Sequence, residues 1–269
     1  MKASSRDGAF GRRIDFHTHV FDPIPIPTPA ELERMRRLAL SYGIEKTVLL
    51  ANATGILMDF KASMSLVRDV NDYTLAAMKL MPDFFVGFCY LNPALPVDFI
   101  HAELERCIVK GGMKGVKLEA AVKATDRRLD PMMERIVALG VPLVHHTWYK
   151  ATGEGLNEST PSDLVDLARR FPSAKIVLAH LGGIRQRGIL DIKAYPNMWV
   201  DTSGSQPEDG LVEYAVRKLG AERILYGSDW PIRDFGVQAG RILGAAISER
   251  DRELILGGNA RRLLGMGGA

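Results

Sequence analysis

Short apolar runs alternate with longer amphipathic segments along this chain, and the alternation repeats eight times. The runs are rich in Val, Ile, Leu and Phe, which is typical of parallel strands buried on both faces. They lie at residues 14–20, 46–51, 84–90, 115–118, 142–145, 175–179, 198–200 and 224–226. The segments with helical periodicity lie at residues 30–42, 66–80, 98–110, 131–139, 161–170, 188–194, 211–219 and 237–246.

Eight strand–helix pairs in one chain predict an α/β fold of the (β/α)8 TIM-barrel type. The alternative is an open, doubly wound sheet, which would carry a G-x-G-x-x-G phosphate loop after an early strand. No such loop stands there. We therefore expect a single barrel domain over residues 1–269, with residues 249–264 forming one more helix outside the ring.

Composition narrows the class of protein further. Cys89 and Cys107 form no C-x-x-C pair, so we expect two reduced core thiols in a cytoplasmic protein. The first residues lack the apolar stretch of a secretory signal, and no apolar run approaches the roughly 18 residues of a membrane span. Net charge is +3, and the basic clusters are short and scattered. The expected partner is a small, anionic molecule rather than nucleic acid or a membrane.

Two histidines lie on the first predicted strand. His17 and His19 are two residues apart, so they point to the same face of a strand. Imidazole suits zinc and other late divalent metals. The alternative is a pair of hydrogen-bonded core histidines, and we favour the metal site because the pair lies on a barrel strand.

More metal-ligating residue types stand at the ends of later strands, where barrel enzymes build their active sites. His180 ends the sixth strand and Asp229 the eighth, although a lone strand-end aspartate can also cap a helix. His145 and His146 both end the fifth strand. Adjacent strand residues face opposite ways, so only one of the two points inward, and spacing alone does not choose between them.

Five motifs, spread from the first strand to the last helix, together resemble the amidohydrolase superfamily. The similarity is to the branch that includes aminocarboxymuconate-semialdehyde decarboxylase, and it covers residues 13–265. It implies a metal-bearing barrel. The motifs are IDFHTH at 14–19, VPLVHHT at 141–147, IVLAHLGG at 176–183, ILYGSDWP at 224–231 and LGGNARRLLG at 256–265.

The resemblance also implies roles for the strand-end residues. In the family's fifth-strand pattern the ligand falls four residues after proline and precedes threonine, which selects His146. His17, His19 and His146 then match metal ligands. Asp229 matches the aspartate that binds the metal and handles the proton of metal-bound water. His180 matches an acid/base or carbonyl polariser in one-metal relatives, and a ligand of the second metal in two-metal relatives.

Glu119 departs from the pattern, because many relatives have a histidine there. It shares a strand face with Lys117, so both should point into the barrel. In two-metal relatives a fourth-strand glutamate or carboxylated lysine bridges the ions. We expect Glu119 to be a metal ligand of this kind. The alternatives are an acid/base or substrate-reading role, an ion pair with Lys117 or an arginine, and a carboxylated Lys117 as the bridge.

The connection after the fifth strand is long for a barrel, and long loops at the catalytic rim are often lids. Trp148 and Lys150 of this loop could cover an anionic, partly apolar substrate. Arg185 and Arg233 follow the sixth and eighth strands and could bind a carboxylate as a fork. The alternative is that the two arginines lie on the surface and that Trp148 only packs against its neighbours.

The resemblance to the superfamily, in which hydrolysis prevails, and the two metals that Glu119 suggests predict a metal-dependent hydrolase. A divalent metal lowers the pKa of bound water to about 7, with Asp229 and His180 as the catalytic groups. We expect cleavage of an ester, lactone, amide or phosphoester in a small, carboxylate-bearing substrate. The ion would be zinc, with manganese or iron as alternatives, in one or two copies, and family habit favours a homodimer. The alternatives are a decarboxylase or hydratase acting on an unsaturated carboxylic acid, and a metal-binding barrel without turnover.

Overall fold

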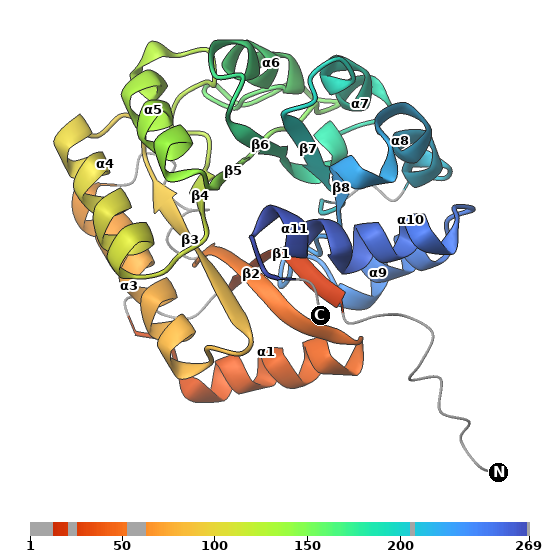
Figure 1. The fold of residues 1–269 in the computed structure, drawn as a ribbon, viewed down its shortest axis with the longest axis horizontal. Coiled ribbons are helices and arrows are strands. Elements are labelled where there is room, and N and C mark those ends of the chain that lie inside the picture. Colours follow the sequence, from red (N-terminus) through yellow and green to blue (C-terminus); the bar gives the residue numbers. More distant parts are fainter. Residues whose placement is uncertain (1–12, 21–25, 53–62, 205–207, 268–269) are drawn as a thin grey trace.

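The computed structural model describes residues 13–20, 26–52, 63–204 and 208–267. Eight parallel strands form one sheet in the order of the sequence, and every neighbouring pair is parallel. The predicted (β/α)8 barrel is therefore confirmed, and Figure 1 looks along its axis. The strands are β1 (Arg13–Val20), β2 (Ile44–Asn52), β3 (Phe85–Leu91), β4 (Gly115–Leu118), β5 (Pro142–His145), β6 (Lys175–Leu178), β7 (Met198–Asp201) and β8 (Ile224–Leu225).

Backbone hydrogen bonds join β1 to the segment that follows β8. The Phe16 amide donates to the Tyr226 carbonyl at 2.8 Å, and the His19 amide donates to the Trp230 carbonyl at 2.7 Å. The Asp229 amide donates to the His17 carbonyl at 2.8 Å. Because the last two contacts lie beyond the end of β8, they also hold the first and last strand ends together at one rim.

In the described part of the chain, α-helices surround the strands (Figure 1). The fifth predicted helix, residues 161–170, has the observed bounds of α6, and Thr160 and Asp163 form a reciprocal capping box at its start. The helices are α1 (Pro29–Ser41), α3 (Met64–Leu80), α4 (Val97–Leu104), α5 (Asp130–Leu139), α6 (Pro161–Arg170), α7 (Arg187–Ile192), α8 (Leu211–Leu219) and α9 (Phe235–Leu243).

Two predicted helices contain π-helical turns in the structure. Residues 98–110 continue from α4 into a π-helical turn, η1 (Glu105–Lys110). Residues 249–264 divide into α10 (Glu249–Glu253), a π-helical turn η5 (Leu254–Gly258) and α11 (Asn259–Leu263). Single-turn 3-10 helices complete the structure: η2 (Arg127–Leu129), η3 (Ala179–Gly182) and η4 (Ala221–Arg223).

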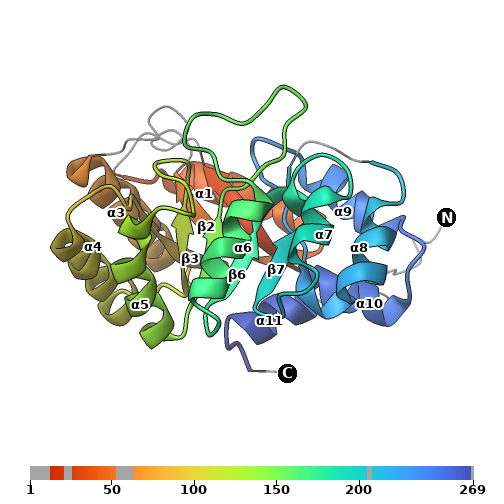
Figure 2. The same cartoon turned by 90° about the horizontal axis from the view of Figure 1, so that it is seen from above.

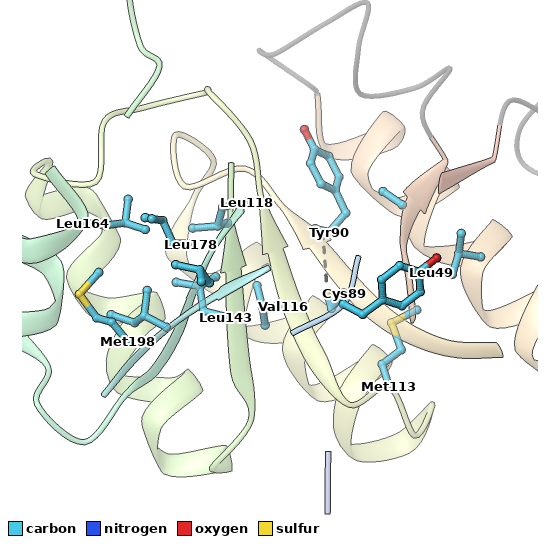
Figure 3. Packing of buried hydrophobic residues seen from close by; sticks show 14 of the residues in the cluster. Leu49, Cys89, Tyr90, Met113, Val116, Leu118, Leu143, Leu164, Leu178 and Met198 are labelled. Carbon is cyan, nitrogen blue, oxygen red and sulfur yellow. Dashed lines mark hydrogen bonds between the residues drawn. The ribbon is translucent and has the colours of Figure 1, made fainter. Parts of the chain in front are cut away.

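The apolar side chains form two clusters on opposite faces of the strands. The outer cluster packs strands against helices, as with Leu143 and Leu178 beside Leu164 of α6 (Figure 3). The inner cluster fills the barrel and includes Val144 and Val177. Each such side chain, fully buried, contributes about 1.5–3 kcal/mol, so both faces of the sheet stabilise the fold.

The two ends of the barrel are closed differently. Ala260 and Leu263 of α11 belong to the inner cluster, and Figure 2 shows α11 beneath the strands. At the opposite end a long loop between β5 and α6 rises above the barrel (Figure 2). Apolar packing therefore seals one end, and the histidine-bearing strand ends lie at the other.

Cys89 and Cys107 are buried and free, as expected. Among the residues that the structure describes, no helix combines the length and the apolar character needed to cross a membrane.

Candidate metal centre

Three ligand-bearing side chains converge at the strand ends of β1 and β8. His17 Nε2 lies 3.2 Å from His19 Nε2. Asp229 Oδ1 lies 3.6 Å from each of these nitrogens. All three residues are buried, and their ligand atoms lie close enough together to hold one metal ion.

The hydrogen bonds of the two imidazoles show which nitrogen of each is bare. His17 Nδ1 lies 2.8 Å from Asp201 Oδ2, and His19 Nδ1 lies 3.3 Å from the carbonyl of Ala51. A carboxylate and a carbonyl only accept, so both Nδ1 atoms carry the proton and both Nε2 atoms present lone pairs. The two lone pairs and the Asp229 carboxylate point toward one another and repel. A cation between these three groups would remove the repulsion. The donor set fits a divalent metal.

The backbone around His17 is specified by two further contacts. Asp15 Oδ1 accepts hydrogen bonds from the amides of His17, at 3.1 Å, and Ser228, at 2.9 Å. A Cβ on Gly227 would lie 2.8 Å from the His17 Cβ. Glycine before Ser228 therefore makes room for the β1 histidine, and Asp15 ties β1 to the turn that presents Asp229.

His180 lies beside this cluster in a strained conformation. Its φ is 66°, and the Asp201 carboxylate accepts from its amide at 3.1 Å. Its ring lies 5.3 Å from that of His17 and 4.5 Å from that of Trp148. Its Nδ1 is buried and finds no hydrogen-bond partner among the described residues. A non-glycine residue held at positive φ with an unused polar atom is typical of a functional site.

Burial sets the protonation of these groups. It holds the pKa of His17, His19 and His180 well below the usual value, and the Lys117 ammonium adds to the effect. The imidazoles are therefore neutral near pH 7, which is the form that binds metal. Burial raises the pKa of the Asp229 carboxyl to about 7, against the opposing charge of Lys117.

Glu119 points into the barrel beside Lys117, as their shared strand face predicted. Lys117 Nζ lies 3.1 Å from Glu119 Oε1, and both side chains are buried. His146 Nδ1 lies 3.4 Å from Glu119 Oε2. Burial acts to raise the pKa of Glu119, but Lys117, His146 and His19 outweigh it and hold the value below normal.

Of the adjacent pair at the end of β5, His146 turns toward the other histidines. Its ring lies 5.1 Å from that of His180. His145 pairs in register with Leu118 and Leu178, which belong to the outer cluster. Its Nδ1 lies 2.7 Å from the carbonyl of His146. Since paired residues of parallel strands share a face, His145 faces the helix layer.

The loop after β5 brings a second carboxylate to His146. Glu158 Oε1 lies 2.8 Å from His146 Nε2, and Glu158 Oε2 accepts from Lys150 Nζ at 2.7 Å. Burial acts to raise the pKa of Glu158, but these partners and the Gly155 amide lower it to about 2. Lys150, expected to face substrate, thus contacts this carboxylate, whereas Trp148 stands beside His180.

The two predicted rim arginines lie in different surroundings. The Arg233 amide donates to the Asp229 carbonyl at 2.9 Å, and Arg233 Nε is buried without a hydrogen-bond partner within the described part of the chain. Arg185 is exposed, and its amide donates to Glu208 Oε1 at 2.9 Å. The Arg233 guanidinium donates to the Ile232 carbonyl at 2.8 Å, and its charge acts to lower the pKa of Asp229, whereas no contact joins Arg185 to the metal cluster among the described residues.

Sequence reasoning missed two residues of this site. Asp201 ends β7 and could have been found by the strand-end rule that found Asp229, had the strand been extended by one residue. Glu158 lies in an irregular loop, twelve residues beyond His146. No periodicity marks it, so only the folded loop shows this contact.

The comparisons with known proteins place the chain in a family. Residues 14–266 match the model of the amidohydrolase family. The chain belongs to this family. The amidohydrolase resemblance that the motifs predicted is therefore confirmed.

Several proteins similar to this chain are decarboxylases. The chain is 26% identical to gamma-resorcylate decarboxylase of Polaromonas sp. (strain JS666), over 86% of each chain. It is 23% identical to 2-amino-3-carboxymuconate-6-semialdehyde decarboxylase of Dictyostelium discoideum, over 97% of this chain and 80% of that one. A crystal structure of dihydroxybenzoic acid decarboxylase from Polaromonas, with bound manganese and the inhibitor 2-nitroresorcinol, superposes with a TM-score of 0.75 at 22% identity and covers 96% and 98% of the two chains.

These relatives correct the predicted reaction. We expected a hydrolase, because hydrolysis is the commoner reaction of the superfamily, and this expectation was wrong. The matched proteins favour the decarboxylase alternative. The physical reason for the error is that a fold and its metal ligands do not fix the reaction, since the same donor set can serve both chemistries.

Proposed function

We propose that this protein is a metal-dependent decarboxylase of a small aromatic or otherwise unsaturated carboxylic acid. The observation that carries the proposal is the match to two decarboxylases over most of both lengths. The converging donors of His17, His19 and Asp229 support it. The reaction breaks the bond between the carboxyl group and an unsaturated carbon, releases CO2 and places a proton on that carbon.

Four residues would hold one divalent ion, and manganese is our first choice because a related structure contains it. They are His17, His19, His146 and Asp229. When bound, the ion would supply a fixed positive charge that polarises a substrate oxygen. The bridge between two ions that the sequence predicted for Glu119 stays a prediction. The Lys117 ammonium at 3.1 Å already neutralises this carboxylate, which favours the role in substrate reading or proton transfer.

The chain's own groups would divide the remaining work. Arg233, with its buried Nε, would bind an acidic group of the substrate, and Trp148 would cover the flat apolar part. His180, neutral and with a free Nδ1, would hydrogen-bond a substrate oxygen. Asp229, whose carboxylate lies beside His17 and His19, would pass on the proton that replaces the carboxyl group.

A direct assay tests the proposal. Protein reconstituted with manganese or zinc is incubated with gamma-resorcylate, with 2-amino-3-carboxymuconate-6-semialdehyde and with a panel of hydroxybenzoic acids, and CO2 release is measured. We expect release that requires metal and stops on chelation. Folded, metal-loaded protein that releases no CO2 from any of these acids would reject the proposal.

A further inference from the structure

The loop between β5 and α6 is closed at its base and reaches back to the site. Thr147 and Ser159 form a parallel bridge, and the Trp148 amide donates to the Ser159 carbonyl at 3.1 Å. The tip is exposed, with Leu156 90% accessible. Glu158, next to the base, is only 4% exposed. A charged side chain turned inward from an exposed loop needs partners, and they identify its role.

His146 is the inner partner of this carboxylate. Its Nε2 lies 2.8 Å from Glu158 Oε1, and its Nδ1 faces Glu119 inside the barrel. The hydrogen bond to Glu158 at 2.8 Å holds the proton on Nε2, because the Glu119 carboxylate lies farther from Nδ1, at 3.4 Å. Nδ1 is then the atom left for other chemistry. The imidazole is partly exposed and can otherwise turn over, because the last side-chain torsion of histidine has two similar wells.

The outer partners of Glu158 belong to the loop itself. Glu158 Oε2 accepts from Lys150 Nζ at 2.7 Å and from the Gly155 amide at 2.9 Å. One carboxylate therefore joins the two sides of the loop and also orients His146. If the loop opens and Glu158 withdraws, the ring loses the contact that sets its orientation.

We propose that Glu158 is a positioning residue, which fixes His146 for metal binding and couples the closed state of the 147–159 loop to the metal centre. This inference rests on the proposed function in taking His146 as a ligand. The sequence did not single out Glu158, and the match to the family does not assign it. Carboxylates that orient a metal-binding histidine typically change metal affinity or activity 10–100-fold when removed.

The test measures manganese affinity by competition with a chelator, together with kcat and KM. We expect Glu158→Ala to weaken manganese binding about 10–100-fold. Glu158→Gln keeps an acceptor oxygen and should lose less manganese affinity than Glu158→Ala. Glu154→Gln is the matched control, since it makes the same change in the same loop without contacting His146, and it should bind manganese like the wild type. The midpoint of thermal unfolding, measured without metal, shows that each variant is folded.

The outcomes separate this inference from the proposed function. Wild-type manganese affinity in Glu158→Ala, alongside a loss in His146→Ala, would overturn the positioning role. An equal loss in Glu154→Gln would also overturn it, because the effect would then belong to the loop in general. A wild-type protein without decarboxylase activity, combined with weak manganese binding in Glu158→Ala, would reject the proposed reaction and support the positioning role.

Discussion

Two glutamates, Glu103 and Glu119, are buried in different layers of this protein, and their neighbours satisfy them to different degrees. Glu103 lies on α4, between the helices and the strands, and is inaccessible to solvent. Arg106 donates to it twice, at 2.9 and 2.7 Å, and Asn71 donates at 3.0 Å. Arg68 adds a longer contact at 3.4 Å.

Glu119 lies inside the barrel and has a sparser set of partners. Lys117 and His146 approach it at 3.1 and 3.4 Å. In both glutamates burial acts to raise the pKa, and in both the hydrogen-bonding and charged partners outweigh burial and lower the pKa. Burial and the direction of the pKa shift are therefore alike in the two glutamates. The two differ in how many hydrogen bonds they receive and in which groups lie next to them.

The largest loss of metal binding and turnover should follow from removing the two histidines of the metal cluster. His17→Ala combined with His19→Ala should abolish metal binding and lower turnover at least about 10³-fold, since metal catalysis contributes several kcal/mol. Elemental analysis and kcat measure both. The barrel should still fold, because these residues line the rim and not the packed layers. Full metal content in the folded double variant would show that this cluster is not the metal site.

Glu119→Gln should lower kcat on the order of 10²-fold, which is the usual contribution of a group that moves a proton. Metal content should stay at one ion per chain, because Lys117 already neutralises the carboxylate. A fall from two ions to one would instead support the bridge between two metals. Unchanged turnover and metal content, with lower stability, would make Glu119 a structural residue like Glu103.

His145 and His146 are adjacent in sequence, yet we expect only one of them to bind metal. His146→Asn removes a proposed ligand, so it should weaken metal binding by more than the roughly 10–100-fold that loss of an orienting residue costs. His145→Asn should leave metal binding unchanged, since His145 faces the helix layer. Metal titration of both variants makes the comparison. The reverse result would mean that the family offset selected the wrong histidine.

Glu103→Gln should have the smallest effect, with no change in turnover and a stability loss of about 1–2 kcal/mol, because Arg106 is partly exposed. Its pKa is lowered from its ordinary value of 4.5, so the ionised carboxylate stabilises the native state above that pH. As the pH falls through the native pKa, this contribution disappears. Urea unfolding should show a full difference from the wild type at pH 7 and a shrinking one below pH 4.5. A gap that persists in acid would refute the ion-pair account.

Much of the barrel could be predicted from the sequence, because strands buried on both faces need apolar runs and rim residues follow them. The observed β4 and β5 have the predicted bounds. The shared face of His17 and His19 follows from strand geometry alone.

The sequence pattern did not predict side-chain directions where inward-facing and outward-facing residues stop alternating along a strand. Phe16 and His17 are neighbours, yet Phe16 packs edge-to-face on Phe88 inside the barrel while His17 joins the metal cluster. A register shift between Asp15 and Thr18, which spans one residue more in β1 than in β2, accompanies this arrangement. Bulges of this kind depend on the paired strand, so the sequence of β1 alone does not show it.

The sequence by itself predicted the barrel, the rim where the strand ends meet and most candidate ligands, because these follow from the repeated alternation of strand and helix patterns along the chain. Only the tertiary structure decided that Glu158 meets His146, that Asp201 orients His17 and that Lys117 faces Glu119 at ion-pair distance. The first two contacts join residues from separate parts of the chain. A buried charge selects its partner by proximity in space, and a one-dimensional pattern does not contain that distance.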